Sequence, residues 1–164
     1  MKAIFERVSV RRFEDKAVEP EKIEKILRAG MAAPSGGNQR PWEFCVVRDR
    51  NTIDALAGAS PYAGCARNAN TVIVPCFRTS GLIYPELTDM DMSACVENML
   101  IEITALGLGG VWLSIAPYED RMRKTDEILG LNDDLRSFAL IPVGYPAATP
   151  VPHDRYEESR VHEI

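Results

Sequence analysis

The chain has 164 residues, of which 46% are apolar and 26% are charged, and its net charge is −5. This composition is typical of a globular protein with one domain, and an acidic chain without a lysine- or arginine-rich run argues against nucleic acid as a partner. No apolar run is long enough to span a membrane and no signal peptide is evident, so we expect a cytoplasmic protein without a membrane partner.

The first half of the chain predicts an alternation of helices and strands. A short helix is expected over residues 2–7, and a clearer one follows Glu19-Pro20, where proline suits the first turn, and stops before Pro34. The next elements are a strand over 42–47, a short helix over 51–57 and a strand over 71–77. Because proline cannot donate a ladder hydrogen bond, Pro75 places the last strand at an edge or at a bulge.

The second half begins with a long predicted helix over residues 89–106. It is followed by a strand over 111–115, a helix over 119–129 and a strand over 138–143. The chain beyond Pro146 is proline-rich, and such a tail is stable only if it docks on something. The alternation of elements indicates a mixed α/β or α+β fold in one domain, residues 1–164.

Apolar residues surround much of the predicted helix over 89–106. They are Met90, Met92, Ala94, Cys95, Val96, Met99, Leu100, Ile101, Ile103 and Leu106. A helix of this kind is buried on most sides, and a second copy of the helix would cover it in so small a chain, so we hypothesise a homodimer. Asp89 and Asp91 suit a helix N-terminus better than half of a metal site.

The histidines and cysteines predict no metal site. Only His153 and His162 are present, and no C-x-x-C spacing occurs. We expect the cysteines to be small buried apolar residues. They are Cys45, Cys65, Cys76 and Cys95.

The segment Arg7-Val8-Ser9-Val10-Arg11 is the strongest candidate for a binding site. In an extended chain, alternate side chains point the same way, so two guanidiniums and a hydroxyl would converge, with Val8 and Val10 facing the protein. Guanidinium donors match phosphate oxygens in pairs, and the segment therefore suits a small anionic ligand. The alternative is a solvated basic patch near a terminus.

A second candidate is the turn from Ala33 to Trp42, which joins a helix to a strand. Its paired glycines permit close approach to a flat ligand, and Ser35 and Asn38 offer short polar groups. The turn lacks the Gly-Lys-Ser/Thr of a P-loop, and it follows a helix where a Rossmann fingerprint would follow a strand. A simple helix-to-strand turn is the alternative interpretation.

These motifs, in this order, resemble the FMN-dependent nitroreductase family over essentially the whole chain. The matching motifs are Arg7-x-Ser9-x-Arg11 with Phe13, Ala33-Pro34-Ser35 through Asn38 to Pro41-Trp42, Leu106-Gly107-Leu108-Gly109 with Trp112, Gly144-Tyr145-Pro146, and the tail from Arg155-Tyr156 to Val161-His162. The resemblance implies an α+β nitroreductase-like fold, with a central mixed, mainly antiparallel sheet flanked by helices. It also implies a domain-exchanged homodimer with a long interface helix.

The resemblance also implies roles for individual residues. Arg7, Ser9 and Arg11 would hold the FMN phosphate and ribityl chain, with Val8 and Val10 passing close by, and Arg155 would return to the phosphate from the tail. The loop that reaches the flavin from the other subunit would contain Pro34, Ser35, Gly36 and Asn38. Ser114 and Ile115 would place their backbone beside the reactive nitrogen of the flavin ring.

The implied function is an FMN-dependent oxidoreductase that takes hydride from NADH or NADPH and reduces nitroaromatics, quinones or related small-molecule acceptors by ping-pong transfer. The flavin carries the chemistry, so no catalytic side chain is assigned. The alternatives are a specialised relative (flavin fragmentation, reductive dehalogenation or ring dehydrogenation) and a flavin-binding or sensing protein with little turnover.

The chain also departs from the family pattern. The family often has glutamine directly before the Pro-Trp pair, whereas this chain has Arg40 there and Gln39 one place earlier. The stretch between Cys76 and Asp89 is short for a substrate lid. Tyr62, Phe77 and Tyr84 are candidates for the lining of a substrate cavity, and Trp112 is expected to be a buried strand aromatic, with stacking on the flavin as the alternative.

Overall fold

The computed structural model describes residues 2–164. The helices are α1 (Ala3–Glu6), α2 (Pro20–Met31), α3 (Arg50–Leu56), α4 (Thr88–Ala105) and α5 (Glu119–Leu129). The strands are β1 (Trp42–Val47), β2 (Thr71–Arg78), β3 (Gly109–Gly110), β4 (Leu113–Ser114), β5 (Leu135–Ser137) and β6 (Ala139–Gly144). Short 3₁₀ segments are η1 (Gly36–Asn38), η2 (Ala63–Asn68), η3 (Pro85–Leu87) and η4 (Glu158–Arg160).

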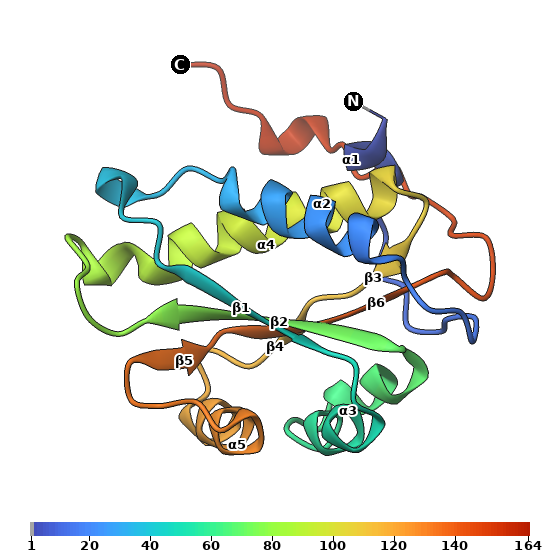
Figure 1. Cartoon of the computed structure of the whole chain (residues 1–164). Helices are drawn as coiled ribbons and strands as arrows, with labels where there is room; N and C mark the ends of the chain where they lie inside the picture. The colour runs from blue at the N-terminus through green and yellow to red at the C-terminus, as the bar shows by residue number, and fades with distance from the viewer. Residues whose placement is uncertain (1) are drawn as a thin grey trace.

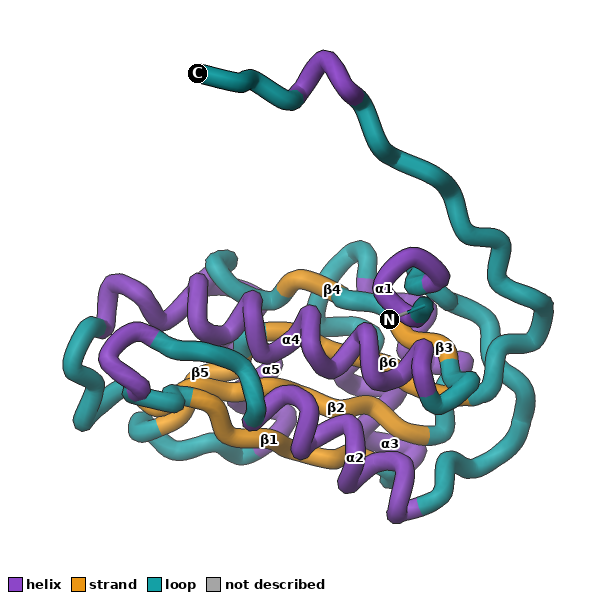
Figure 2. The backbone as a smooth tube through the Cα atoms, turned by 90° about the horizontal axis from the view of Figure 1, so that it is seen from above, coloured by secondary structure: helices purple, strands orange, loops and turns teal. Residues whose placement is uncertain are grey.

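A central sheet lies between two layers of helices (Figure 1). Its strand order is β1-β2-β6-β3, with β4 also on β6 and β5 also on β2. The strand pairs are antiparallel, and a bridge between Ser9 and Gly110 is parallel. Helices α2 and α4 cover one face, where they run side by side (Figure 2), and α3 and α5 cover the other (Figure 1). The expected mixed, mainly antiparallel sheet flanked by helices is confirmed.

Helices α2 and α4 pack closely because α2 presents a glycine to α4. Ile23, Ile26 and Gly30 are the buried residues of α2. A Cβ added to Gly30 would lie 2.9 Å from Cγ of Met99 and 3.1 Å from Sγ of Cys95, so this contact has no room for a side chain. The apolar residues between this layer and the sheet form one core cluster, and a second cluster lies under α3 and α5.

Helix α4 follows the predicted element within one residue at each end. Its face toward the sheet and α2 is buried, but Met90, Glu97 and Ala105 are exposed. The expectation that the helix is buried on most sides is therefore only partly met within one chain. An exposed strip remains along α4 in this structure.

Pro75 lies inside the sheet, so the expectation of an edge strand was wrong. Strand β2 has β1 on one side and β5 and β6 on the other. The pairing register of β2 shifts by one residue between the pair Ile73↔Ile141 and the pair Cys76↔Ser137. The β5–β6 segment that pairs with β2 therefore contains one extra residue opposite Pro75. The alternative of a bulge is confirmed, because this irregularity lies where proline has no N–H to donate.

Of the strand expected over 111–115, only Leu113–Ser114 is formed, as β4, whereas β3 (Gly109–Gly110) precedes the expected range. Both pair with β6 in one continuous register, so the gap falls opposite Ile141 and Pro142. Proline again lacks the donor that a ladder needs, and this explains the gap. The strand expected over 138–143 is β6, and β5 was not predicted.

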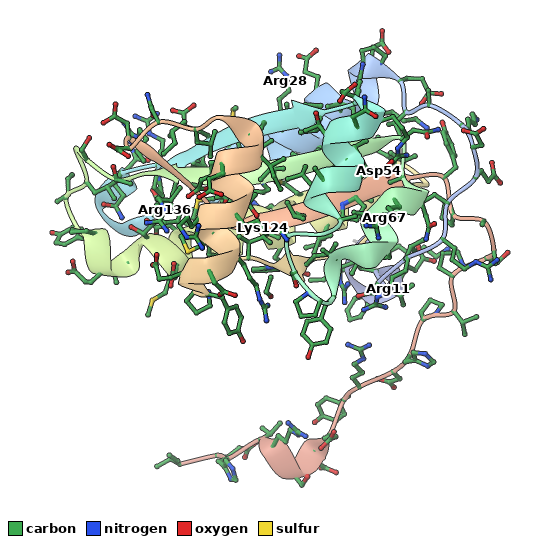
Figure 3. The ribbon with its side chains drawn as sticks, turned by 90° about the horizontal axis from the view of Figure 1, so that it is seen from below. Arg11, Arg28, Asp54, Arg67, Lys124 and Arg136 are labelled. Atoms are coloured by element: carbon green, nitrogen blue, oxygen red, sulfur yellow. The ribbon has the colours of Figure 1, made fainter. Side chains whose placement is uncertain are left out.

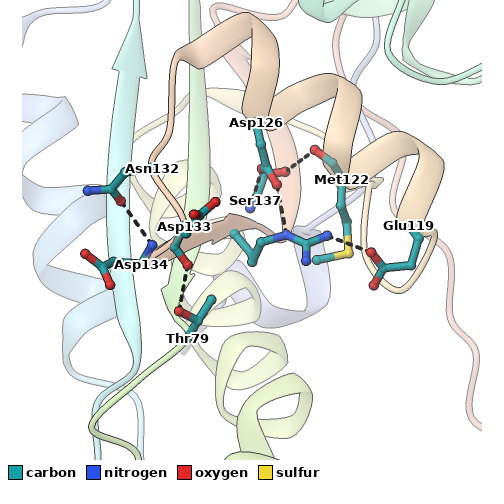
Figure 4. Close-up of polar contacts among 9 residues, drawn as sticks. Thr79, Glu119, Met122, Asp126, Asn132, Asp133, Asp134 and Ser137 are labelled. Carbon is teal, nitrogen blue, oxygen red and sulfur yellow. Dashed lines mark hydrogen bonds and ion pairs between the residues drawn. The ribbon is translucent and has the colours of Figure 1, made fainter.

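Helix α5 is fastened to β5 by one arginine. The Arg136 guanidinium donates to Asp126 Oδ2 at 2.9 Å and to Glu119 Oε2 at 2.8 Å. Asp126 also accepts the Ser137 N–H at 2.9 Å (Figure 4). These two carboxylates raise the pKa of Arg136, with the Glu119 hydrogen bond as the largest cause.

Three sequence expectations concern cysteines, metals and membranes. Cys76 and Cys95 are buried as expected, but Cys45 and Cys65 are only half-buried, and all four thiols are free. Within residues 2–164 no group of three or more His, Cys, Asp or Glu side chains is arranged to hold a metal ion. In the same residues no helix has the length and apolarity to cross a membrane, and the cytoplasmic location remains a prediction.

Candidate functional site

The N-terminal segment is extended and lies along the short strand β3. Ser9 forms a bridge with Gly110, and the Val10 N–H donates to the Gly110 carbonyl at 2.9 Å. A Cβ added to Gly109 would lie 2.7 Å from Cβ of Val10, so glycine is needed for this approach. The extended conformation predicted for residues 7–11 is confirmed, and it follows from pairing with the glycine pair that ends the turn after α4.

Ser9, Arg11 and Arg155 line one open cavity of 640 Å³. Arg12 and His153 also line it, and among residues 2–164 no aspartate or glutamate does so. Arg11 lies on the side of the body from which the C-terminal tail leads away (Figure 3). An exposed hydroxyl with several guanidiniums and no carboxylate is a favourable environment for a phosphate.

Arg7 does not converge with Ser9 and Arg11 on one cavity, as the sequence had predicted, but opens into a neighbouring one. This second cavity has a volume of 590 Å³, and its lining includes Arg7, Val8, Arg155 and one carboxylate, that of Asp154. The Arg7 guanidinium also lies 3.6 Å from a carboxylate oxygen of Glu97 on α4. Val8 lines both cavities, Val10 lines the first and also packs on Gly109, and both valines are half-buried.

Ser114 and Arg11 line a third cavity, of 410 Å³. Ser114 is exposed there, but Ile115 is fully buried and its N–H donates to the Phe138 carbonyl at 3.3 Å. Only Ser114 of this predicted pair is therefore accessible to a ligand. Trp112, expected to be buried, is half-buried beside Phe138 and also lines this cavity.

Two further residues of the third cavity were not predicted from the sequence. The Arg121 guanidinium lies 3.8 Å from the ring centre of Tyr118 and 5.7 Å from that of Tyr62. Arg121 also donates to the Ser114 carbonyl at 3.2 Å, which fixes the guanidinium in the cavity wall. Tyr118 and Arg121 are three residues apart at a helix start, and this spacing could have indicated that they are neighbours. No sequence pattern indicates that Tyr62 lies beside them. Tyr62 does line a cavity, as the sequence suggested.

The turn containing Pro34, Ser35, Gly36 and Asn38 lies at the other end of α4. The Gly36 N–H donates to Asp91 in the first turn of that helix, whereas Ser9 bridges Gly110 in β3, which follows the last turn of α4 (Figure 1). A helix of 18 residues is about 27 Å long. One chain therefore places Arg7, Ser9, Arg11, Ser114 and Arg155 around three cavities that share lining residues, but it does not bring the turn to them.

A larger cavity lies elsewhere and has the wrong charge for a phosphate. It has a volume of 710 Å³, lies between α5 and β5, and its lining includes the acidic residues Glu119, Asp120, Asp126, Glu127 and Asp133. Carboxylates repel a phosphate, so we favour the arginine-lined cavities. Near these, burial raises the pKa of the Cys65 thiol and the charge of Arg11 opposes the rise.

Comparison with known proteins gives a consistent result. A family model described as "Nitroreductase family" matches residues 4–63 and 58–145. A protein of Archaeoglobus fulgidus named for NADH dehydrogenase and NAD(P)H nitroreductase activity is 37% identical, over 99% of this chain and 95% of its own length.

Solved structures agree with the sequence matches. A Clostridium acetobutylicum protein described as an NADH oxidase is 42% identical with a TM-score of 0.94, covering 98% of this chain and 97% of its own. A nitroreductase-type protein of Desulfovibrio desulfuricans, determined in complex with FMN, is 32% identical with a TM-score of 0.85, covering 99% of this chain and 95% of its own.

Proposed function

Because this chain belongs to the nitroreductase family, we propose that it is an FMN-dependent NAD(P)H oxidoreductase that reduces nitroaromatics, quinones or related acceptors. An oxidoreductase is the function that the family match and the named relatives support in general terms. The observation that carries the finer proposal is the cavity in which Ser9, Arg11 and Arg155 meet without a carboxylate.

The residues present fit a phosphorylated flavin. The arginine-lined cavity suits the phosphate, and the third cavity, which shares Arg11, offers aromatic and apolar walls to a flat ring system. Arg7, Ser9, Arg11 and Arg155 would hold the phosphate and ribityl chain, and Ser114 would lie beside the ring. FMN, when bound, supplies the redox chemistry by accepting hydride from NADH or NADPH and passing reducing equivalents to an acceptor.

The side chains would bind and orient the flavin and supply positive charge. The guanidiniums neutralise a phosphate, and Arg121, held by two tyrosine rings and by the Ser114 carbonyl, adds a fixed positive charge to the third cavity. Fixed positive charge stabilises negative charge that develops nearby during a reaction. In this proposal no side chain donates or removes a proton.

We propose that the working unit is a homodimer with FMN at the subunit interface. The exposed strip of α4 (Met90, Glu97 and Ala105) offers a surface to a second copy. The tail beyond Pro150 is exposed throughout and carries the exposed apolar residues Val151, Tyr156, Val161 and Ile164. A partner would cover both surfaces, and its turn with Pro34, Ser35, Gly36 and Asn38 would complete the flavin site. Light scattering should then give twice the mass of the 18.2 kDa chain.

A spectroscopic experiment tests the proposed function. The purified protein, supplied with FMN, should be yellow, should bleach with NADH or NADPH, and should regain its colour with a nitroaromatic or quinone acceptor. Double-reciprocal plots with both substrates varied should be parallel, as ping-pong turnover requires. Failure to take up FMN would reject the proposal, and a yellow protein that neither nicotinamide reduces would favour a specialised or flavin-binding role.

A further inference from the structure

The turn between α2 and β1 has an unusual backbone. Gly37, Asn38 and Arg40 have positive φ angles of 55°, 55° and 46°. Left-handed conformations cost non-glycine residues about 1–2 kcal/mol each, and they persist where the surroundings hold them, often at ligand-binding loops. Such strain requires specific contacts that keep the 35–40 turn in shape.

Two buried polar side chains, Gln39 and Asp91, supply those contacts. The Gln39 side-chain amide donates to Asp91 Oδ2 at 2.7 Å, and the Gly36 N–H donates to Asp91 Oδ1 at 2.8 Å. Gln39 is 7% exposed and Asp91 is 5% exposed, so water competes little for these bonds. The sequence had suggested only a helix-start role for Asp91.

Gln39 also holds a second segment of the chain, residues 83–87, which precedes α4. Its Oε1 accepts the Tyr84 N–H at 2.9 Å, and its Nε2 donates to the Tyr84 carbonyl at 3.0 Å. The Tyr84 ring lies over the turn, because a Cβ added to Gly37 would be 2.8 Å from Tyr84 Cε2. One side chain therefore binds the backbone of both segments.

Further contacts close the turn from its other side. Arg78 donates to the carbonyls of Gln39 and Arg40 at 2.9 Å and 3.1 Å, and the Arg40 N–H donates to Ser35 Oγ at 2.9 Å. The Arg40 side chain itself is exposed. Gln39, one place earlier than the glutamine common in the family, thus has a structural task that Arg40 does not share.

We propose that Gln39 and Asp91 are positioning residues that fasten the 35–40 turn and the 83–87 segment into one unit. The segment is then a fixed wall of the acceptor site and not a lid that opens in each turnover. This role at the acceptor site rests on the proposed function, in which the turn contacts the flavin of the partner. The exposed side chains of Ile83 and Tyr84 would be the part of the wall that an acceptor meets.

Hydrogen exchange followed by mass spectrometry tests the coupling without any flavin. Gln39→Glu places two carboxylates together and removes the donor to the Tyr84 carbonyl, so amide protection should fall in both segments by at least tenfold. Asp91→Asn is a milder variant, because an oxygen remains for the Gly36 N–H, and it should reduce protection of both segments less. Loss of protection in only one segment, in either variant, would overturn the inference.

The exchanged pair Gln39→Glu with Asp91→Asn provides the rescue. The new amide at position 91 can donate to the new carboxylate at position 39, which still accepts the Tyr84 N–H. Amide protection should return to within about threefold of the wild type. Of the hydrogen bonds that the two side chains make, all except the one to the Tyr84 carbonyl are restored. An exchanged pair that is no better than Gln39→Glu alone would show that the contact does not position these segments.

Flavin and acceptor measurements then place the unit at the site. In Gln39→Glu, FMN affinity should fall at least tenfold and the KM for a quinone should rise, and both should recover in the exchanged pair. Asp89→Asn, on the same helical turn but with an exposed side chain, is the matched control and should behave as the wild type. If the wild type takes up no FMN, the proposed function fails, but the exchange experiment still decides the coupling. Unchanged FMN affinity and KM in Gln39→Glu would overturn the role of the unit at the acceptor site.

Discussion

The guanidinium of Arg7 lies 3.6 Å from the carboxylate of Glu97, so the first arginine of the proposed phosphate site is paired with an acid of the long helix. The two side chains are 21% and 49% exposed. Half-exposed ion pairs of this kind contribute at most about 1 kcal/mol. Arg7 is therefore available to a phosphate, but Glu97 competes for it.

Glu97→Gln should tighten FMN binding, because it removes a negative charge beside the proposed phosphate site. A gain of about 0.5–1 kcal/mol in the free energy of FMN binding corresponds to roughly a two- to fivefold lower dissociation constant. Fluorescence titration of FMN at low salt measures this effect, and added salt should reduce it. FMN binding that does not tighten in this variant would place the phosphate away from Arg7.

Arg11→Ala should weaken FMN binding more than any other single change in the N-terminal segment. One hydrogen bond to a charged group is worth about 1.5–3 kcal/mol, which is roughly a 10- to 150-fold loss of affinity. Arg48→Ala is a suitable control, since Arg48 is also exposed but lies outside the arginine-lined cavities. Equal affinities in the Arg11 variant, the Arg48 variant and the wild type would show that the site is misplaced.

Cys45 should be the most reactive thiol, and its reactivity should depend on pH. A hydrogen bond with Cys76 lowers the pKa of Cys45 to about 7, whereas burial raises the pKa of Cys95 to about 12. The reactive thiolate becomes more abundant as pH rises, so the alkylation rate of Cys45 should be half-maximal near pH 7.

A peptide-mapped time course with iodoacetamide between pH 5.5 and 9 measures this profile. Cys76→Ala removes the hydrogen-bond partner, so the midpoint for Cys45 should move to higher pH, whereas Cys95→Ala should leave it in place. The prediction is contradicted by a Cys45 midpoint that is the same with and without Cys76.

Arg40→Gly should stabilise the protein, although it removes a side chain. Arg40 has a φ of 46°, a conformation that glycine adopts without strain, and the backbone contacts of residue 40 with Ser35 and Arg78 remain. Part of the gain in stability is offset by the greater freedom of glycine in the unfolded chain. We therefore expect the free energy of unfolding to rise by at most about 1 kcal/mol. Urea unfolding should show a higher midpoint for Arg40→Gly than for the wild type. Arg40→Ala, which keeps the strain, should show no increase in the midpoint.

Local patterns in the sequence predicted most of the elements but few of their partners. The bounds of β1 and α5 were predicted without error, because a compact run or a capped amphipathic pattern defines each of them. Strand β5 was missed because Leu135–Ser137 is too short for alternation to be visible. Pro75 signalled an irregularity, but only the pairing register distinguishes a bulge from an edge.

The same division applies to the candidate site. Arg7, Ser9 and Arg11 were identified because they are adjacent in the sequence and share a chemistry. The contacts of Gln39 with Asp91 and of Tyr62 with Arg121 join residues that are distant in the chain, so no local pattern points to them. The place of the Pro34–Asn38 turn at the far end of α4 likewise depends on the packing of α2 on α4.

The most direct test of the phosphate site is a comparison of FMN with riboflavin, which differs only in lacking the phosphate. Titration of the flavin-free protein with each should give at least about a hundredfold tighter binding of FMN, as expected from two or more charge-assisted hydrogen bonds. The preference should shrink in Arg11→Ala. Equal affinities for FMN and riboflavin in the wild-type protein would contradict the account.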